Sequence, residues 1–186
     1  TWTIQAWVKP DPGADGVVIR RLAGIPGDPA NPGTISYELG VKNVGGAIRP
    51  YVRYVGVNTT TLGALEVLVD GSGPTEIKGG SQATSQIAPL EWSHLAGTYD
   101  PDTHTLSLYI NGDLSSYRTD AYEPVWLGLN AAVCSTPLTI GGGESLLGIV
   151  QNGFEGWLDD VAILSGAMSA TDIADYANSD VSKLDL

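Results

Sequence analysis

The chain has 186 residues and a formal net charge of −12, from 9 basic and 21 acidic residues. It has no run of Lys or Arg that could neutralise a phosphate backbone, and no apolar stretch of about 18 residues that could span a membrane. The composition therefore argues against nucleic acid as a partner and against insertion into a membrane. With 24 glycines, 11 prolines, 5 tryptophans and 8 tyrosines, it is typical of an all-β domain and not of a helical bundle or a disordered chain.

Short runs of alternating apolar and polar residues, each closed by Gly, Pro, Asn or Asp, predict about ten β-strands. These runs are Trp2–Val8, Val17–Leu22, Thr34–Val41, Ile48–Val55, Ala64–Val69, Trp92–Tyr99, Thr105–Asn111, Leu114–Thr119, Pro137–Ile140 and Phe154–Leu164. Asn111 and Gly112 can supply the two positive φ values of a tight type I′ hairpin. The pattern predicts antiparallel strands joined by short turns.

One segment near the C-terminus, Ala170–Ala177, has the pattern of a helix. Ser169 stands at its N-cap and Asp172 at the capping-box position. Taken together, the elements predict an all-β, antiparallel two-sheet jelly-roll sandwich with one short C-terminal helix, forming a single domain over residues 1–186. Because Trp2 already lies in a predicted strand, we expect the chain to be excised from or processed out of a larger protein.

Several segments follow one another in an order that is specific to a protein family. They are Thr3–Pro10, Trp92–Asp100 followed by Leu106–Gly112, Leu138–Gly142 with Gly156–Ile163, and the closing segment Ala167–Ile173. Together they resemble the LamG-like jelly rolls (laminin G and pentraxin-like) of the concanavalin A-like lectin/glucanase superfamily. The resemblance implies one concave and one convex sheet, with Trp7, Trp92 and Trp157 in the core. It also implies a role in carbohydrate binding, adhesion or protein contact.

The superfamily includes glucanases, so catalytic carboxylates are the first kind of site to consider. Retaining glycosidases use two carboxylates about 5.5 Å apart, but the glucanase pattern Glu-x-Asp-x-x-Glu is absent. Asp159 and Asp160 are adjacent, so a strand would point them to opposite faces. Asp100 and Asp102 fall in a predicted turn, and His94 is expected to be a core imidazole within its strand. We therefore expect that the protein is not an enzyme.

The same two carboxylates raise the question of a metal. Asp159 and Asp160 lie in a strand whose faces are otherwise apolar, and an unpaired buried carboxylate is costly. One of them is therefore expected to meet Ca²⁺, an Arg or backbone N–H groups, which predicts a structural Ca²⁺ site at Asp159 or Asp160. The resemblance to pentraxins adds Glu144, which matches one of their calcium-binding acidic positions in type and implies a calcium-dependent ligand site there.

A candidate ligand surface lies on the predicted strand Ile48–Val55, where Arg49, Tyr51 and Arg53 share one face. Guanidinium groups can hold hydroxyls or the carboxylate of an acidic sugar through paired hydrogen bonds. Glu38 lies on the polar face of the preceding strand, and Arg20 or Arg21 on the strand before it. If these strands adjoin, the same residues can instead form cross-strand ion pairs on a solvated sheet face, so both interpretations remain open.

Trp126 is the last candidate residue and lies in a predicted loop. Its ring can serve as a stacking platform for a sugar, or it can plug one end of the sandwich. The sequence as a whole predicts a non-catalytic carbohydrate-binding or adhesive module of a secreted or cell-surface protein, with a glycan or another extracellular protein as its partner. The alternative is a structural or protein–protein interaction module of an extracellular assembly that has no sugar ligand.

Overall fold

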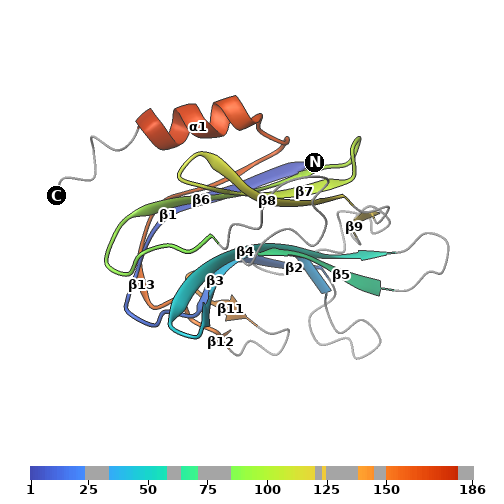
Figure 1. The fold of residues 1–186 in the computed structure, drawn as a ribbon. Coiled ribbons are helices and arrows are strands. Elements are labelled where there is room, and N and C mark those ends of the chain that lie inside the picture. Colours follow the sequence, from blue (N-terminus) through green and yellow to red (C-terminus); the bar gives the residue numbers. More distant parts are fainter. Residues whose placement is uncertain are drawn as a thin grey trace.

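The computed structural model describes residues 1–23, 34–57, 64–70, 85–119, 123–124, 138–144 and 150–179. Within them, two antiparallel sheets pack face to face, and helix α1 (Ala170–Ser179) lies on the far side of one sheet (Figure 1). This arrangement confirms the predicted jelly-roll sandwich with a short C-terminal helix. No helix among the described residues is long and apolar enough to cross a membrane.

The sheet beneath α1, called sheet A here, is built around the N-terminal strand. In spatial order its strands are β13 (Gly156–Leu164), β1 (Trp2–Pro10), β6 (Ser93–Asp100), β7 (Thr105–Ile110) and β8 (Asp113–Thr119). Asn111 and Gly112 join β7 to β8 with φ values of 52° and 86°. The predicted hairpin with two positive φ values is therefore confirmed.

The facing sheet, called sheet B, carries the candidate ligand surface. Its strands in spatial order are β10 (Leu138–Ile140), β2 (Gly16–Ala23), β3 (Thr34–Val44), β4 (Ala47–Val57) and β5 (Ala64–Asp70), and β9 (Glu123–Pro124) pairs with β4 as well. A separate ribbon pairs β11 (Gly143–Glu144) with β12 (Val150–Gln151). The sequence did not predict β9, β11 or β12, because a strand of two residues has no periodicity to detect.

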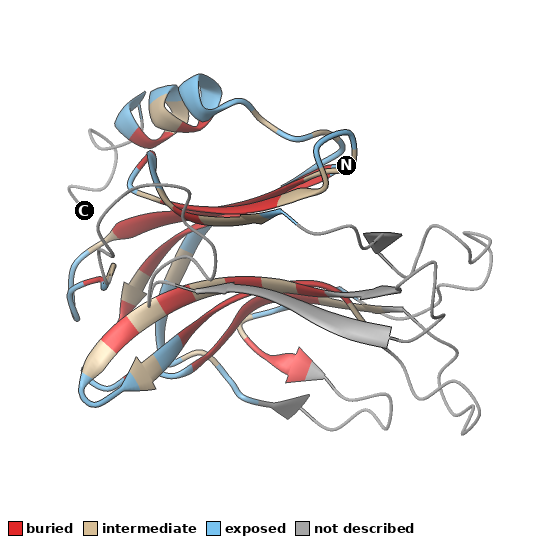
Figure 2. Ribbon diagram, turned by 45° about the vertical axis from the view of Figure 1, so that its right-hand side comes forward, coloured by how far each residue is buried: buried red, intermediate tan, exposed pale blue. Residues whose placement is uncertain are grey.

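The core fills the space between the two inner faces, shown in red in Figure 2. Alternate residues of each strand point into it, and those that are fully buried include Ile4, Val8, Leu39, Val52, Leu106 and Leu108. Tyr54 of sheet B meets Tyr99 of sheet A edge to face, with ring centroids 5.0 Å apart. Because strand side chains alternate in direction, the polar residues of β3 and β4 are left on the outer face of sheet B.

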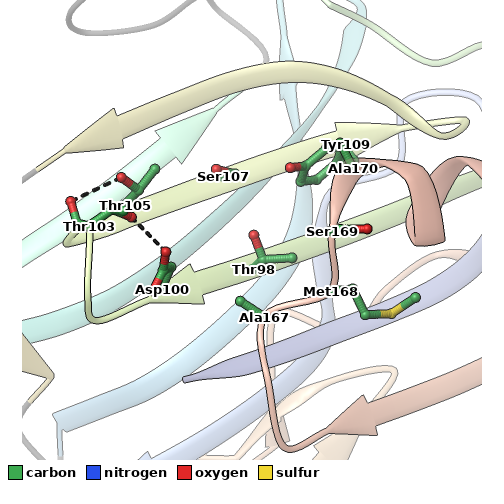
Figure 3. Close-up of a pocket in the computed structure, with 10 residues that line it drawn as sticks. All are labelled: Thr98, Asp100, Thr103, Thr105, Ser107, Tyr109, Ala167, Met168, Ser169 and Ala170. Atoms are coloured by element: carbon green, nitrogen blue, oxygen red, sulfur yellow. Dashed lines mark hydrogen bonds between the residues drawn. The ribbon is translucent and has the colours of Figure 1, made fainter.

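The outer face of sheet A is divided into two halves. Helix α1 covers one half, where the buried residues Ala96, Tyr109 and Ile173 form a second apolar cluster. The helix begins where the sequence predicts, because the backbone N–H of Asp172 donates to Ser169 Oγ at 3.2 Å. The other half is lined by hydroxyl groups of β6 and β7 and forms an open pocket (Figure 3).

The framework tryptophans differ from one another in burial. Trp7 is 4% exposed and packs beside the buried His94, with ring centroids 5.5 Å apart. Trp92 is half-buried and precedes β6 instead of lying in it. The prediction that Trp157 lies in the core is wrong, because its residue is 55% exposed. It stands on β13, which is an edge strand of sheet A and therefore has a neighbouring strand on one side only.

Candidate functional site

The predicted polar face is assembled by the register of β3 against β4. Glu38 lies opposite Arg53, Gly40 opposite Tyr51, and Lys42 opposite Arg49. Directly paired residues of antiparallel strands project to the same side of the sheet, so these side chains share the outer face of sheet B. Strand β2 adds Arg20, which lies opposite Glu38 from the other side. Strands β2, β3 and β4 are therefore neighbours, as the candidate site required. Of the two arginines on β2, Arg20 is the one that belongs to the site.

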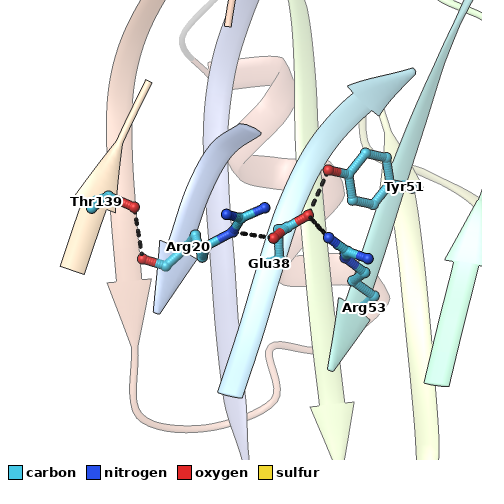
Figure 4. A network of polar contacts seen from close by, with 5 residues as sticks. All are labelled: Arg20, Glu38, Tyr51, Arg53 and Thr139. Carbon is cyan, nitrogen blue, oxygen red and sulfur yellow. Dashed lines mark hydrogen bonds and ion pairs between the residues drawn. The ribbon is translucent and has the colours of Figure 1, made fainter. Parts of the chain in front are cut away.

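Glu38 is the centre of a network of charge-assisted hydrogen bonds (Figure 4). Its Oε1 accepts from the Tyr51 hydroxyl at 2.6 Å and from Arg53 Nε at 2.9 Å, and Arg53 Nη2 lies 2.8 Å from the same oxygen. Its Oε2 accepts from Arg20 Nε. One carboxylate thus holds two guanidinium groups and a phenol in fixed positions.

The network is buried to different depths along its length. The side chain of Glu38 is 0% exposed, that of Arg20 is 10% exposed, and that of Arg53 is 24% exposed. The predicted cross-strand ion pairs are therefore present, but they lie in a buried cluster and not on a solvated face. Among the charged side chains of the cluster, Arg53 is the most exposed, so it is the one that an anionic ligand can reach most readily.

The electrostatics of the cluster favour an anion at its exposed end. One carboxylate faces two guanidinium groups, so the cluster itself carries a surplus positive charge, while the register places Asp70 and Glu66 of the neighbouring strand β5 opposite Tyr51 and Val55. Four of the nine basic residues of the chain lie on this face, namely Arg20, Lys42, Arg49 and Arg53. Burial, with the charge of Glu38 and its hydrogen bond, raises the pKa of Tyr51 well above its ordinary value. The phenol therefore stays protonated and remains a donor.

Two glycines that the sequence reasoning missed make room for the cluster. A Cβ built on Gly40 would lie 2.6 Å from Cζ and the hydroxyl oxygen of Tyr51, so the tyrosine ring crosses directly over this glycine to reach Glu38. A Cβ on Gly143 would collide with the Arg20 guanidinium, so β11 lies against that side chain. Gly40 could have been noticed as a glycine inside a strand, which often marks a close approach.

The two remaining predicted ligand residues are not part of the cluster: one lies apart from it, and the other lies outside the residues that the structure describes. Arg49 shares its face but stands four residues before Arg53, a separation of about 13 Å along the strand. Its buried Nε has no hydrogen-bond partner among the residues that the structure describes. Trp126 lies outside the described residues. The structure thus brings Tyr51 and Arg53 together and keeps Arg49 as a separate cation on the same surface.

The predicted calcium ligands lie elsewhere. Asp159 and Asp160 stand on the edge strand β13 of sheet A, and both are exposed, so neither is a buried carboxylate that requires a partner. The backbone N–H of Asp160 donates to Asp159 Oδ1 at 2.8 Å. Glu144 is on β11, and its side chain is not described.

The acidic residues in view do not supply a set of ligands that fits calcium. Within the described ranges, no three His, Cys, Asp or Glu side chains gather into a possible metal site. Calcium takes six to eight oxygen ligands, so a site at β13 would depend heavily on backbone carbonyls and water. The structural Ca²⁺ stays a prediction. It can be tested by measuring the melting temperature of the protein with and without a chelator.

The comparisons with known proteins agree with this architecture. Two antiparallel sheets with this strand order define a jelly roll of the lectin and carbohydrate-binding-module type. The family model of the Concanavalin A-like lectin/glucanases superfamily matches residues 1–174, and the chain belongs to this superfamily. The resemblance seen in the sequence is thereby confirmed. None of the curated proteins compared with the chain matches it.

Several solved structures share the fold at low sequence identity. The native heptameric SAP-like pentraxin from Limulus polyphemus matches with a TM-score of 0.61 and 12% identity, over 95% of this chain and 69% of the pentraxin chain. The Ruminococcus gnavus IT-sialidase CBM40 bound to α2,3-sialyllactose matches with a TM-score of 0.63 and 14% identity, over 95% and 82%. The leech intramolecular trans-sialidase matches at 0.59 and 17%, over 94% of this chain but 22% of the enzyme. Such identities show a common fold and no more.

Proposed function

We propose that the chain is a non-catalytic carbohydrate-binding module of a secreted or cell-surface protein, and that it binds sugars bearing a carboxylate. Its ligand surface is the outer face of sheet B around Arg53. The observation that carries the proposal is the way Glu38 holds Arg53: the guanidinium is fixed by two contacts to one buried oxygen, yet 24% of the side chain stays exposed. A fixed, accessible guanidinium is well suited to pairing with a carboxylate.

The rest of the face supports a polyhydroxylated anion over a simple ion. Tyr51 places an aromatic ring beside Arg53, whose guanidinium carbon lies 5.7 Å from the ring centroid. Lys42 and Arg49 extend the positive surface along the same strands. A CBM40 bound to sialyllactose has the same fold, which makes an acidic sugar the first ligand to test.

The absence of catalysis is part of the proposal and has its own support. Glu38, the acidic residue at the centre of the face, has its oxygens already occupied by three donor residues, and the register places Asp70 and Glu66 of β5 further out on the same face. Glycoside hydrolysis uses two carboxyl groups, one of them able to donate a proton. Glu38 is poorly placed for that role, because Arg20, Tyr51 and Arg53 already donate to its oxygens.

The experiment measures binding of 3′-sialyllactose and of lactose by isothermal titration calorimetry. We expect binding of the sialylated sugar alone, and a loss of at least tenfold in affinity in Arg53→Lys, which keeps the charge but loses the fork of donors. Arg118→Ala, on β8 of sheet A, is the control and should bind as the parent does. Failure of 3′-sialyllactose and of every acidic glycan on an array to bind the folded parent would overturn the proposal. Release of sialic acid during the titration would overturn its non-catalytic part.

A second candidate function is a protein-contact module without a sugar ligand. It is favoured by the border strand β13, where Trp157, Ile163 and Leu164 are 55%, 39% and 40% exposed. Exposed apolar side chains on an edge strand are typical of a surface that receives another strand or a partner. Sedimentation velocity separates the two candidates: self-association that Trp157→Ser abolishes, together with no glycan binding, favours the second.

A further inference from the structure

The open half of the outer face of sheet A forms a pocket of about 360 Å³ that lies on the opposite side of the sandwich from Arg53. Its floor comes from β6 and β7, and its wall from the segment that leads into α1 (Figure 3). Thr3 fixes this segment, because its hydroxyl donates to the carbonyl of Gly166 at 2.7 Å and accepts from the backbone N–H of Met168 at 2.9 Å. The wall is therefore held in place by the sheet itself.

The floor of the pocket is a cluster of hydroxyl groups. Thr98 and Ser107 face each other in register across β6 and β7 and are 5% and 8% exposed. The Tyr109 hydroxyl lines the same pocket, and burial raises its pKa, so it stays protonated. Each hydroxyl is both donor and acceptor. Such a floor can pair with a ligand that also carries groups of both kinds.

The rim selects against a negative ligand. Asp100 accepts hydrogen bonds from the Thr103 hydroxyl at 2.8 Å and from the backbone N–H of Asp102 at 3.0 Å. These bonds lower the pKa of Asp100, so its carboxylate is ionised at neutral pH. None of the lining residues is basic. The local charge is therefore opposite in sign to that of the face around Arg53.

The wall adds an aliphatic surface. Ala167, Met168 and Ala170 line it. A pyranose presents hydroxyls around its edge and C–H groups on its faces, so its two kinds of surface correspond to the floor and the wall. The volumes of small-molecule pockets begin at about 300 Å³. This pocket is near that lower limit, so it can hold only a small ligand.

We propose that this pocket is a second binding site, which takes a single neutral hexopyranose residue. The inference is independent of the acidic-sugar site on sheet B, since the two share no residue. A ligand of about 12 heavy atoms without a stacking platform would bind with a dissociation constant of roughly 1–10 mM. Two sites on opposite faces would let one module hold an acidic and a neutral sugar at once.

The test is a titration of the ¹⁵N-labelled protein with methyl glycosides of glucose, galactose and mannose, followed by ¹H–¹⁵N correlation spectra. We expect one of them to shift the amides of residues 98–107 and 167–170 in a saturable way. Asp100→Asn keeps an oxygen for the turn but loses the charge-assisted bond to the ligand, so it should weaken this binding about tenfold. Asp113→Asn, the same exchange at an exposed position of β8 outside the pocket, is the matched control.

Three outcomes would overturn the second site. One is the absence of saturable shifts at these amides with all three glycosides. Another is equal binding of a methyl glucuronide there, which would remove the selection for a neutral ligand. The last is saturation of the same amides by CaCl₂, which would reassign the pocket to a cation. Arg53→Lys should leave the neutral-sugar shifts unchanged, so failure of the sheet B site and failure of this site are distinguishable.

Discussion

Glu38 and Arg53 face each other across the β3–β4 pair, and both Nε and Nη2 of Arg53 lie within 2.9 Å of the same carboxylate oxygen. Glu38 is fully buried on the outer side of a sheet, where a carboxylate would ordinarily be solvated. Because it also binds Arg20 and Tyr51, its burial is compensated by three donor residues. The candidate site is therefore a structural cluster whose exposed end is available for a ligand.

Removing the charge at the centre of the cluster should destabilise the protein. In Glu38→Gln, two guanidinium groups lose their counter-charge while Arg20 remains largely buried, so we expect a loss of about 3 kcal/mol in the free energy of unfolding. Urea denaturation measures it. Glu91→Gln, an exposed change, is the control and should stay within about 0.5 kcal/mol of the parent. A Glu38→Gln variant as stable as the parent would show that the cluster contributes little to the fold.

Gly40→Ala tests the crossing of the Tyr51 ring over β3. The added Cβ would lie 2.6 Å from the ring and 2.7 Å from the carbonyl oxygen of Gly16, so it is confined on both sides. We expect a cost of about 1–3 kcal/mol and a weakened bond from Tyr51 to Glu38. Gly153→Ala, where a Cβ would have its nearest neighbour at 3.8 Å, is the matched control. Similar melting temperatures for the two variants would contradict the close approach.

The stability of the protein should fall in alkali because of Tyr51. Its pKa is raised in the folded state above the ordinary value near 10, so its contribution is complete below pH 10 and is lost as the pH rises above that value. Unfolding free energies measured by urea from neutral pH to about pH 11 should show this decline. Tyr51→Phe should be less stable at neutral pH by about 1–2 kcal/mol and should decline less steeply. An unchanged slope would assign the decline to other groups, of which Tyr109 is the first candidate.

The sequence predicted those features that depend on neighbouring residues. Alternation alone placed Arg49, Tyr51 and Arg53 on one face, and the capping pattern located the start of α1 at Ser169. The hairpin at Asn111 followed from the tolerance of Asn and Gly for positive φ. These signals are local, so they remain visible without knowledge of the tertiary structure.

What the sequence could not predict depends on residues far apart in the chain. The burial of Glu38 requires Arg20 beside it and β11 lying against Arg20, and β11 is more than a hundred residues away from Glu38 in the sequence. The exposure of Trp157 follows from the position of β13 at the border of sheet A. Alternation shows which residues share a face of a strand, but it does not show which strand stands at an edge or what covers an outer face.

The hairpin glycine Gly112 should prove more sensitive than its conformation alone explains. Gly112 and Gly46 have similar φ values, 86° and 91°, and both lie in turns between paired strands. A Cβ on Gly46 would meet nothing within 4 Å, whereas a Cβ on Gly112 would lie 2.9 Å from Cα of Ala174 in α1.

Gly46→Ala should therefore lower the free energy of unfolding by roughly 1–2 kcal/mol, which is the cost of a left-handed backbone conformation in a residue that has a side chain. Gly112→Ala should cost a further 1–3 kcal/mol, approximately, because α1 must shift. Hydrogen exchange of the α1 amides distinguishes the two effects, since it should accelerate in Gly112→Ala alone. Equal stability losses with unchanged exchange in α1 would show that the hairpin and the helix are not in tight contact. In that case the wall of the sheet A pocket would have to be fixed by Thr3 alone.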